Sequence, residues 1–93
     1  MTFGEALERA KLGAKMAREG WNGKDMWITW SPGNEELSAD KFFAPANRLF
    51  AESQGGYAKV LPCMTMKTAC NHILIGWLAS QTDMLAEDWF VVV

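Results

Sequence analysis

The stretch KMAREGWNGKDMWITW, residues 15–30, decides the fold because it predicts a β-hairpin. Asn22-Gly23 is a favoured pair for a two-residue type I′ turn, in which both positions take positive φ. Strands before and after this turn would place Arg18 directly opposite Trp27, where the guanidinium can stack on the indole as a cation–π pair. The stretch therefore predicts two adjacent antiparallel strands.

The predicted register also divides the side chains of this hairpin between two faces. Met16 and Arg18 share one face with Trp27, whereas Trp21 and Ile28 share the other face. Large apolar side chains occur on both faces of the hairpin, so other elements of the protein can cover either face.

Two capping patterns predict helices near the ends of the chain. Thr2 and Glu5 have the spacing of a capping box and predict a helix over about residues 3–12. The stretch Ser80–Asp83 repeats this spacing and predicts a short helix over about residues 81–87.

The remaining strands are predicted in the C-terminal third of the chain. Residues 60–68 and 72–78 predict a second hairpin, and Pro62 indicates that its first strand starts there or lies at a sheet edge. Residues 89–93 predict a final strand, with Trp89 and Val91 in the core.

These elements predict an α+β fold: a small antiparallel sheet of about five strands, with an N-terminal helix and a short C-terminal helix packed on it. The length of 93 residues fits a single domain. Residues 34–56 lack a clean period and are interpreted as a variable excursion, in which residues 47–54 could form a short helix.

Charge and hydropathy exclude several classes of partner. Nine Lys and Arg against eleven Asp and Glu give a net charge of -2, whereas nucleic-acid affinity comes mostly from Lys and Arg that neutralise phosphates. The longest apolar stretch, residues 73–79, is too short to span a bilayer. The N-terminal residues, with Glu5, lack the layout of a signal peptide. We therefore expect a cytoplasmic protein without a nucleic-acid or membrane partner.

The chain is rich in large apolar side chains. Five Trp, five Phe, one Tyr and six Met are more than one small core needs. The surplus is expected to line a pocket or a subunit interface, where aromatic residues and Met are enriched. For a single Trp an aromatic-rich core is the simpler interpretation, but the set as a whole favours an oligomer.

The groups that catalysis or metal binding would need are isolated. Cys63 and Cys70 are expected to be free thiols, because a small disulfide scaffold usually carries four or more Cys. His72 is the single His, and nothing near it has metal-ligand spacing. No Ser lies in a nucleophile-elbow motif, and no Gly-rich phosphate loop is present. We expect no catalytic residues, no metal, no cofactor and no enzyme activity.

Two groups of residues combine the features that hold a phosphorylated nucleotide. Aromatic faces stack on a base, cationic and backbone N–H groups bind phosphate, and amide, hydroxyl and carboxylate groups bind ribose. The first group is Arg18, Trp21, Asn22 and Lys24, and the second is Lys67, Thr68, Trp77, Ser80, Gln81, Thr82 and Asp83. Structural alternatives remain open: Asn22 as a turn former, the cations as solvated or paired charges, and Asp83 as a helix cap.

Four blocks of the chain carry a family resemblance. They are Phe3–Leu7, Ala17–Lys24, Met66–Ala69 and Trp77–Trp89. Together they resemble the second Thoeris anti-defence family, which consists of small phage and prophage proteins. The resemblance covers about residues 1–33 and 57–93, and its third block adds Met66 to the candidate ligand-binding residues.

The resemblance implies a protein that sequesters an immune signal. Thoeris defence uses a TIR-domain enzyme to make a cyclic ADP-ribose isomer, which activates an effector that kills or depletes the infected cell. Members of the family bind this signal without cleaving it and assemble as homotetramers with ligand pockets between protomers. Some members also bind cyclic dinucleotides at separate sites. The same activity, partners and assembly are thereby implied for this chain.

Two other functions compete with this one. The chain could be a small phage or prophage module that docks on a host protein through an aromatic surface, or an enzyme that degrades the same signal. Heating separates the cases, because a sequestering protein releases intact signal and an enzyme releases altered product. A docking module would ignore the nucleotide and retain a host protein in a pull-down.

Overall fold

The computed structural model describes all 93 residues, which form two compact units. The first unit comprises Met1–Ser31 and Cys63–Val93, and the second comprises Pro32–Pro62. The excursion predicted over residues 34–56 lies within the second unit.

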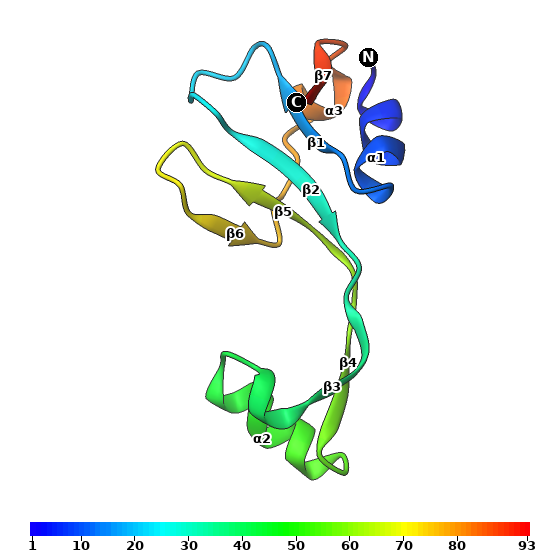
Figure 1. The fold of residues 1–93 in the computed structure, drawn as a ribbon, viewed down its shortest axis with the longest axis vertical. Helices are drawn as coiled ribbons and strands as arrows, with labels where there is room; N and C mark the ends of the chain where they lie inside the picture. Colours follow the sequence, from blue (N-terminus) through cyan, green and yellow to red (C-terminus); the bar gives the residue numbers. More distant parts are fainter. The chain divides into compact units, whose positions relative to one another are not determined.

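The first unit is built on a five-stranded antiparallel sheet (Figure 1). Its strands are β1 (Lys15–Arg18), β2 (Trp27–Ser31), β5 (Cys63–Lys67), β6 (Ile73–Ile75) and β7 (Trp89–Val92). They lie in the order β6-β5-β2-β1-β7, so β6 and β7 are the two edges. Helices α1 (Phe3–Lys11) and α3 (Gln81–Leu85) complete the unit. The predicted α+β class is confirmed.

Both predicted capping boxes are present. Thr2 Oγ1 accepts from the backbone N–H of Glu5 at 3.2 Å, and Glu5 Oε1 accepts from the N–H of Thr2 at 2.9 Å. Ser80 and Asp83 exchange the equivalent bonds at 3.0 and 3.2 Å. Each box satisfies backbone donors that a helix N-terminus leaves unpaired. None of the helices has the length and apolar character needed to cross a membrane.

Helix α1 packs on one face of the sheet, against β1, β2 and β7, and α3 packs against α1. The buried side chains on this face form the core: Ala6, Ala10, Met16, Ile28, Met66 and Trp89. Successive residues of a strand point to opposite faces, so Ala17 on β1 and its β7 partner Phe90 point to the other face. We call this second face, which α1 and α3 do not cover, the open face.

The predicted two-residue turn at Asn22-Gly23 is wrong. Met16 pairs with Ile28, whereas the predicted register would have paired Met16 with Thr29. The chain between β1 and β2 is the longer loop 19–26, in which Asp25 takes the left-handed conformation with φ 57°. The shift of one residue moves Met16 and Ile28 onto the same buried face, as the period of a strand requires.

Tertiary contacts explain why the local turn preference is overridden. The backbone N–H of Glu19 donates to the carbonyl of Asp88 at 3.3 Å, and that of Gly20 donates to the Asp88 carboxylate at 2.8 Å. These bonds hold the chain beyond the end of β1 beside Asp88, the residue before β7. The predicted stacking of Arg18 on Trp27 is also wrong: Lys15 Nζ lies 5.7 Å from the Trp27 ring centroid instead.

The second unit is a two-stranded hairpin that carries a helix. Strands β3 (Asn34–Ser38) and β4 (Tyr57–Val60) are antiparallel, with an irregular register between Asn34 and Leu37. Between them lie the 3₁₀ helix η1 (Ala39–Lys41) and helix α2 (Pro45–Ser53). The predicted helix over residues 47–54 overlaps α2, whereas the two strands were not predicted.

Candidate ligand-binding site

Arg18, at the end of β1, lies at the centre of a charge network in the first unit. Its Nε donates to Asp88 Oδ1 at 2.8 Å, and its Nη1 donates to Asp83 Oδ1 at 2.8 Å. Only 12% of the Arg18 side chain is exposed. The hydrogen bonds that Arg18 donates to Asp88 and Asp83 raise the pKa of its guanidinium, and the bond to Asp88 contributes more. Arg18 is therefore a paired structural cation rather than a free one.

Asp83 connects this network to the aromatic residues. Its Oδ1 accepts from the indole Nε1–H of Trp21 at 3.0 Å, and its backbone carbonyl accepts from Trp89 Nε1–H at 3.0 Å. Burial alone would raise the pKa of Asp83, but the hydrogen bonds from Trp21, Arg18 and Ser80 outweigh it and lower the pKa. The carboxylate is thus ionised and fixes the orientation of Trp21.

Trp21 belongs to a group of four aromatic rings. Its centroid lies 5.3 Å from that of Trp89 and 6.3 Å from that of Trp77, with interplanar angles of 81° and 68°. Phe3 packs against Trp89 at 5.4 Å. Edge-to-face contacts at these distances stabilise aromatic groups beyond simple burial. The position of the Trp21 ring is therefore held by packing as well as by its hydrogen bond.

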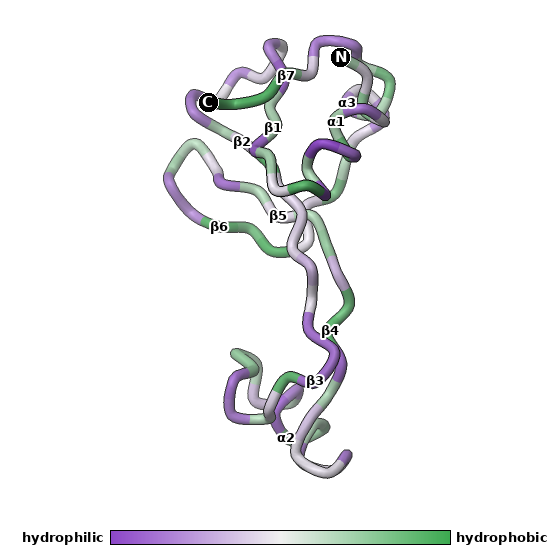
Figure 2. Tube along the Cα trace, turned by 45° about the vertical axis from the view of Figure 1, so that its right-hand side comes forward, coloured by the Kyte–Doolittle hydropathy of each residue, from purple (hydrophilic) through white to green (hydrophobic).

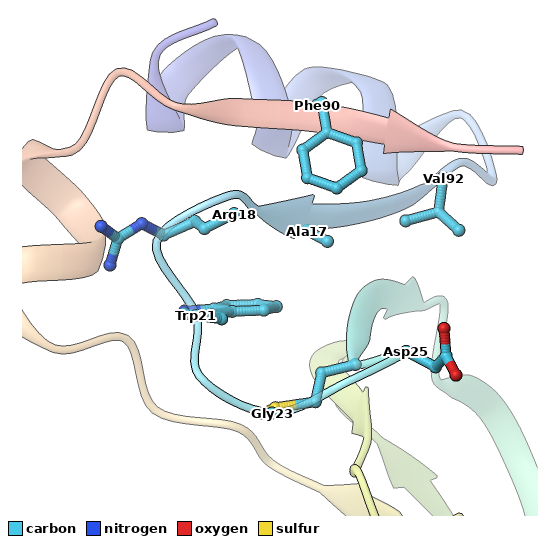
Figure 3. A pocket seen from close by; sticks show the side chains of 8 residues that line it. Ala17, Arg18, Trp21, Gly23, Asp25, Phe90 and Val92 are labelled. Atoms are coloured by element: carbon cyan, nitrogen blue, oxygen red, sulfur yellow. The ribbon is translucent and has the colours of Figure 1, made fainter.

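A hollow lies beside Trp21, on the open face of the sheet (Figure 3). Its volume is about 180 Å³. It is lined by Ala17, Arg18, Trp21, Gly23, Asp25, Met26, Phe90 and Val92. Figure 3 shows the Trp21 ring edge-on, with one face turned toward Ala17 and Phe90. The walls are mostly apolar, and Asp25 supplies a carboxylate at the rim.

Three lysines lie next to residues that line the hollow. Lys24 is exposed between the lining residues Gly23 and Asp25. Lys15 pairs with Val92 across β1 and β7, which places it on the open face. Lys67 Nζ donates to the carbonyl of Asp25 at 2.7 Å. The positive charge available near the hollow thus comes from lysines, because Arg18 already forms ion pairs with Asp83 and Asp88.

The structure joins members of both predicted groups. Arg18 and Trp21 of the first group bond directly to Asp83 of the second, and Trp77 packs on Trp21. Asn22 is exposed in the same loop as Lys24. The remaining predicted residues lie in other surroundings: Met66 is in the core, Thr68 forms the β5–β6 turn, Ser80 caps α3, and Gln81 and Thr82 are exposed on α3.

Several residues of this region were not predicted as site residues, among them Asp25, Phe90, Val92 and Asp88. A signal for two of them was present in the sequence. Because Trp89 and Val91 point into the core, the alternation of a strand puts Phe90 and Val92 on the other face. Asp25 and Asp88 gave no comparable local signal, since their roles depend on the loop path and on Arg18.

Comparison with known proteins identifies the family of this chain. The sequence model of the Tad2-like family, described as a Thoeris anti-defense 2-like domain, matches residues 1–92. The match includes residues 34–56, which the resemblance of the four blocks did not cover. The chain belongs to this family.

A curated relative carries the corresponding name. The chain is 39% identical over 92 residues to "Thoeris anti-defense 2" of Bacillus phage SP01, across 99% of this chain and 94% of that protein. Family membership supports a role against Thoeris defence and an interaction with the Thoeris signalling system.

Proposed function

We propose that this chain binds and sequesters a TIR-derived cyclic ADP-ribose isomer without cleaving it, in the cytoplasm of the infected cell, and thereby inhibits Thoeris defence. The observation that carries the proposal is Trp21, whose ring borders the hollow while Asp83 fixes its indole N–H. Sequestration needs tight equilibrium binding and no stabilisation of a transition state, so uniform ground-state contacts suffice.

The walls of the hollow suit a nucleobase. Trp21 and Phe90 supply aromatic rings, and stacking on an aromatic side chain contributes roughly 1–3 kcal/mol per base as measured by substitution. Because packing and a hydrogen bond already orient Trp21, little conformational entropy is lost when a base stacks on it.

The polar groups at the rim suit the rest of such a ligand. Lys24 and Lys15 can neutralise the pyrophosphate, while the Asp25 carboxylate can accept from a ribose hydroxyl. Arg18 is better suited to hold the wall than to bind phosphate, since two carboxylates share its charge.

The size of the hollow favours a site shared between copies. Ligand pockets typically measure about 300–1,000 Å³ and often lie at interfaces, whereas the hollow of one chain holds about 180 Å³. We therefore include a homotetramer with pockets between protomers in the proposal. The family resemblance extends it to cyclic dinucleotides at a separate site.

The test is capture and release of the signal. Purified protein is incubated with the TIR-generated isomer and filtered, and the retained protein is heated. Mass spectrometry should find intact signal only after heating. Trp21→Ala should weaken binding roughly 5- to 150-fold, from the stacking energy above, and Tyr57→Ala, in the second unit, should not. Signal left free in the first filtrate, or altered product after heating, would overturn the proposal.

A docking module remains the second candidate because of the second unit. Phe43, Leu49 and Phe50 are 86%, 67% and 59% exposed there. The variant Phe43→Ser/Phe50→Ser distinguishes the two functions. If it still captures signal but no longer inhibits Thoeris defence in cells, docking through this unit is the activity. If inhibition follows signal capture in every variant, sequestration is sufficient.

A further inference from the structure

Strand β6 is an edge strand of three residues that carries no charge or Pro to hinder pairing. It lies at one end of the sheet, and Ile73, Leu74 and Ile75 are 60%, 48% and 61% exposed. Figure 2 shows this short strand as a hydrophobic segment. Proteins commonly protect such an edge by keeping the strand short, as here, or with Lys, Pro, a bulge or a covering segment. None of the three residues of β6 is charged or Pro, and its register with β5 is regular.

The opposite edge differs in this respect. The backbone N–H of Trp89 at the start of β7 donates to the carbonyl of Met1 at 3.2 Å, and the amino group of Met1 donates to the carbonyl of Trp89 at 2.8 Å. The chain therefore covers the start of one sheet edge by itself and leaves the apolar edge open.

The hydrogen-bond pattern of β5 and β6 shows which backbone groups of β6 point outward. The N–H of Thr68 donates to the carbonyl of His72, and the N–H of Gly76 donates to the carbonyl of Met64. Antiparallel pairs alternate between bonded and non-bonded positions, so Leu74 bonds toward β5. The N–H and C=O groups of Ile73 and Ile75 consequently point away from the sheet.

The sequence of β6 reads the same in both directions: Ile73-Leu74-Ile75. We propose that β6 pairs antiparallel with β6 of a second copy of this chain, about a twofold axis at Leu74. In this pairing Ile73 lies opposite the partner's Ile75, and Ile75 lies opposite the partner's Ile73. An isologous interface requires such self-complementarity.

The pairing uses every outward backbone group of the strand. Ile73 and Ile75 each exchange two hydrogen bonds with the partner, which gives four bonds around the axis. Leu74 faces the partner's Leu74 at a non-bonded position, where side chains approach most closely. One position further out, His72 lies opposite the partner's Gly76, which has no side chain to obstruct it. The two sheets become one, and their open faces become continuous.

This inference rests on the proposed assembly of several copies and names a strand that joins them. A cysteine cross-link tests it directly. In a Cys63→Ser/Cys70→Ser background, Leu74→Cys puts two thiols on the axis. The Cα atoms of a non-bonded antiparallel pair are about 4.5 Å apart, which a disulfide can bridge. Ile73→Cys is the matched control, because it lies opposite the partner's Ile75 and not opposite its own counterpart.

Oxidation should convert Leu74→Cys to covalent dimers on a non-reducing gel and leave Ile73→Cys largely monomeric. Cross-linking of both variants to the same extent, or of neither, would overturn the proposed register.

The second test is the mass of the assembly by light scattering. Ile75→Pro removes an outward N–H and leaves the bonds to β5 intact, so it should reduce the mass of the assembly by half. Leu12→Lys, at another exposed apolar position, should leave the mass unchanged. An unchanged mass for Ile75→Pro, or a monomeric wild-type chain, rules out the pairing whether or not signal is bound. Failure of sequestration would instead appear as free signal at an unaltered mass.

Discussion

Replacing Asp83 with alanine should destabilise the first unit because three partners lose their acceptor. Arg18 Nη1, the indole N–H of Trp21 and the backbone N–H of Ser80 all donate to this carboxylate. Asp83 and Arg18 are each only 12% exposed, so solvent compensates little of the loss.

The expected cost follows from this geometry. Removing one partner of a buried ion pair typically costs about 3–5 kcal/mol. Asp88 continues to face Arg18 Nε at 2.8 Å, so we expect a value near the lower limit, about 3 kcal/mol. Asp88→Ala should cost about 1–2 kcal/mol, because the Asp88 side chain is 31% exposed. A domain of this length has roughly 5–14 kcal/mol of stability in total.

Urea unfolding followed by tryptophan emission measures the difference. All variants are compared at one protein concentration, because assembly contributes to apparent stability. With a slope of about 1–3 kcal/mol per M, Asp83→Ala should lower the midpoint by roughly 1–3 M. Asp83→Asn keeps an acceptor for Trp21 and the cap of α3, so it should lose less than the alanine variant. If Asp83→Ala costs no more than Asp88→Ala, the central role given to Asp83 is wrong.

Three further predictions concern acid stability, capping and a glycine. Hydrogen bonds lower the pKa of Asp83 and of Asp88 in the folded state, so their stabilisation is present above the unfolded pKa of about 3.9 and is lost as pH falls through the lower folded values. Acid titration followed by circular dichroism should show this loss of stability below about pH 4. The prediction is contradicted if stability depends on pH equally in the wild-type chain and in Asp83→Asn. Thr2→Ala should cost about 1 kcal/mol in thermal or urea unfolding, since it removes the cap of α1; an unchanged midpoint would show that the cap contributes nothing. Gly33→Ala should destabilise the second unit by roughly 1–3 kcal/mol, because φ is 73° and the new Cβ would collide with the carbonyl of Val60. Hydrogen exchange of β3 and β4 measures that effect, and unchanged protection would refute it.

Helices and strands could be predicted where the contacts that determine them join residues close together in the sequence. Thr2 with Glu5, and Ser80 with Asp83, are three residues apart, so each capping box can be recognised from the sequence alone. The hairpin of β5 and β6 was predicted for the same reason, since its turn lies between two adjacent apolar runs.

The register of β1 and β2 was not predictable from local signals. Asn22-Gly23 favours a tight turn, but the residues that oppose it, Asp83 and Asp88, are more than sixty residues away in the sequence. Their bonds to Gly20 and Trp21 exist only after the sheet has formed. Arg18, Trp21 and Asp83 were all selected as candidate ligand-binding residues, but the hydrogen bonds that join them were not predicted.

Successive side chains of β7 point to opposite faces of the sheet, so the residues that stabilise the fold differ from those that line the hollow. Trp89 and Val91 pack on the core, whereas Phe90 and Val92 line the hollow. Under the proposed function, a lineage that meets a changed signal can therefore vary the second pair while the first pair keeps the sheet intact. Trp21 has no such freedom, because it belongs to both environments. Selection for a new ligand should therefore change the residues at positions 90 and 92 of β7 and leave those at positions 89 and 91 unchanged.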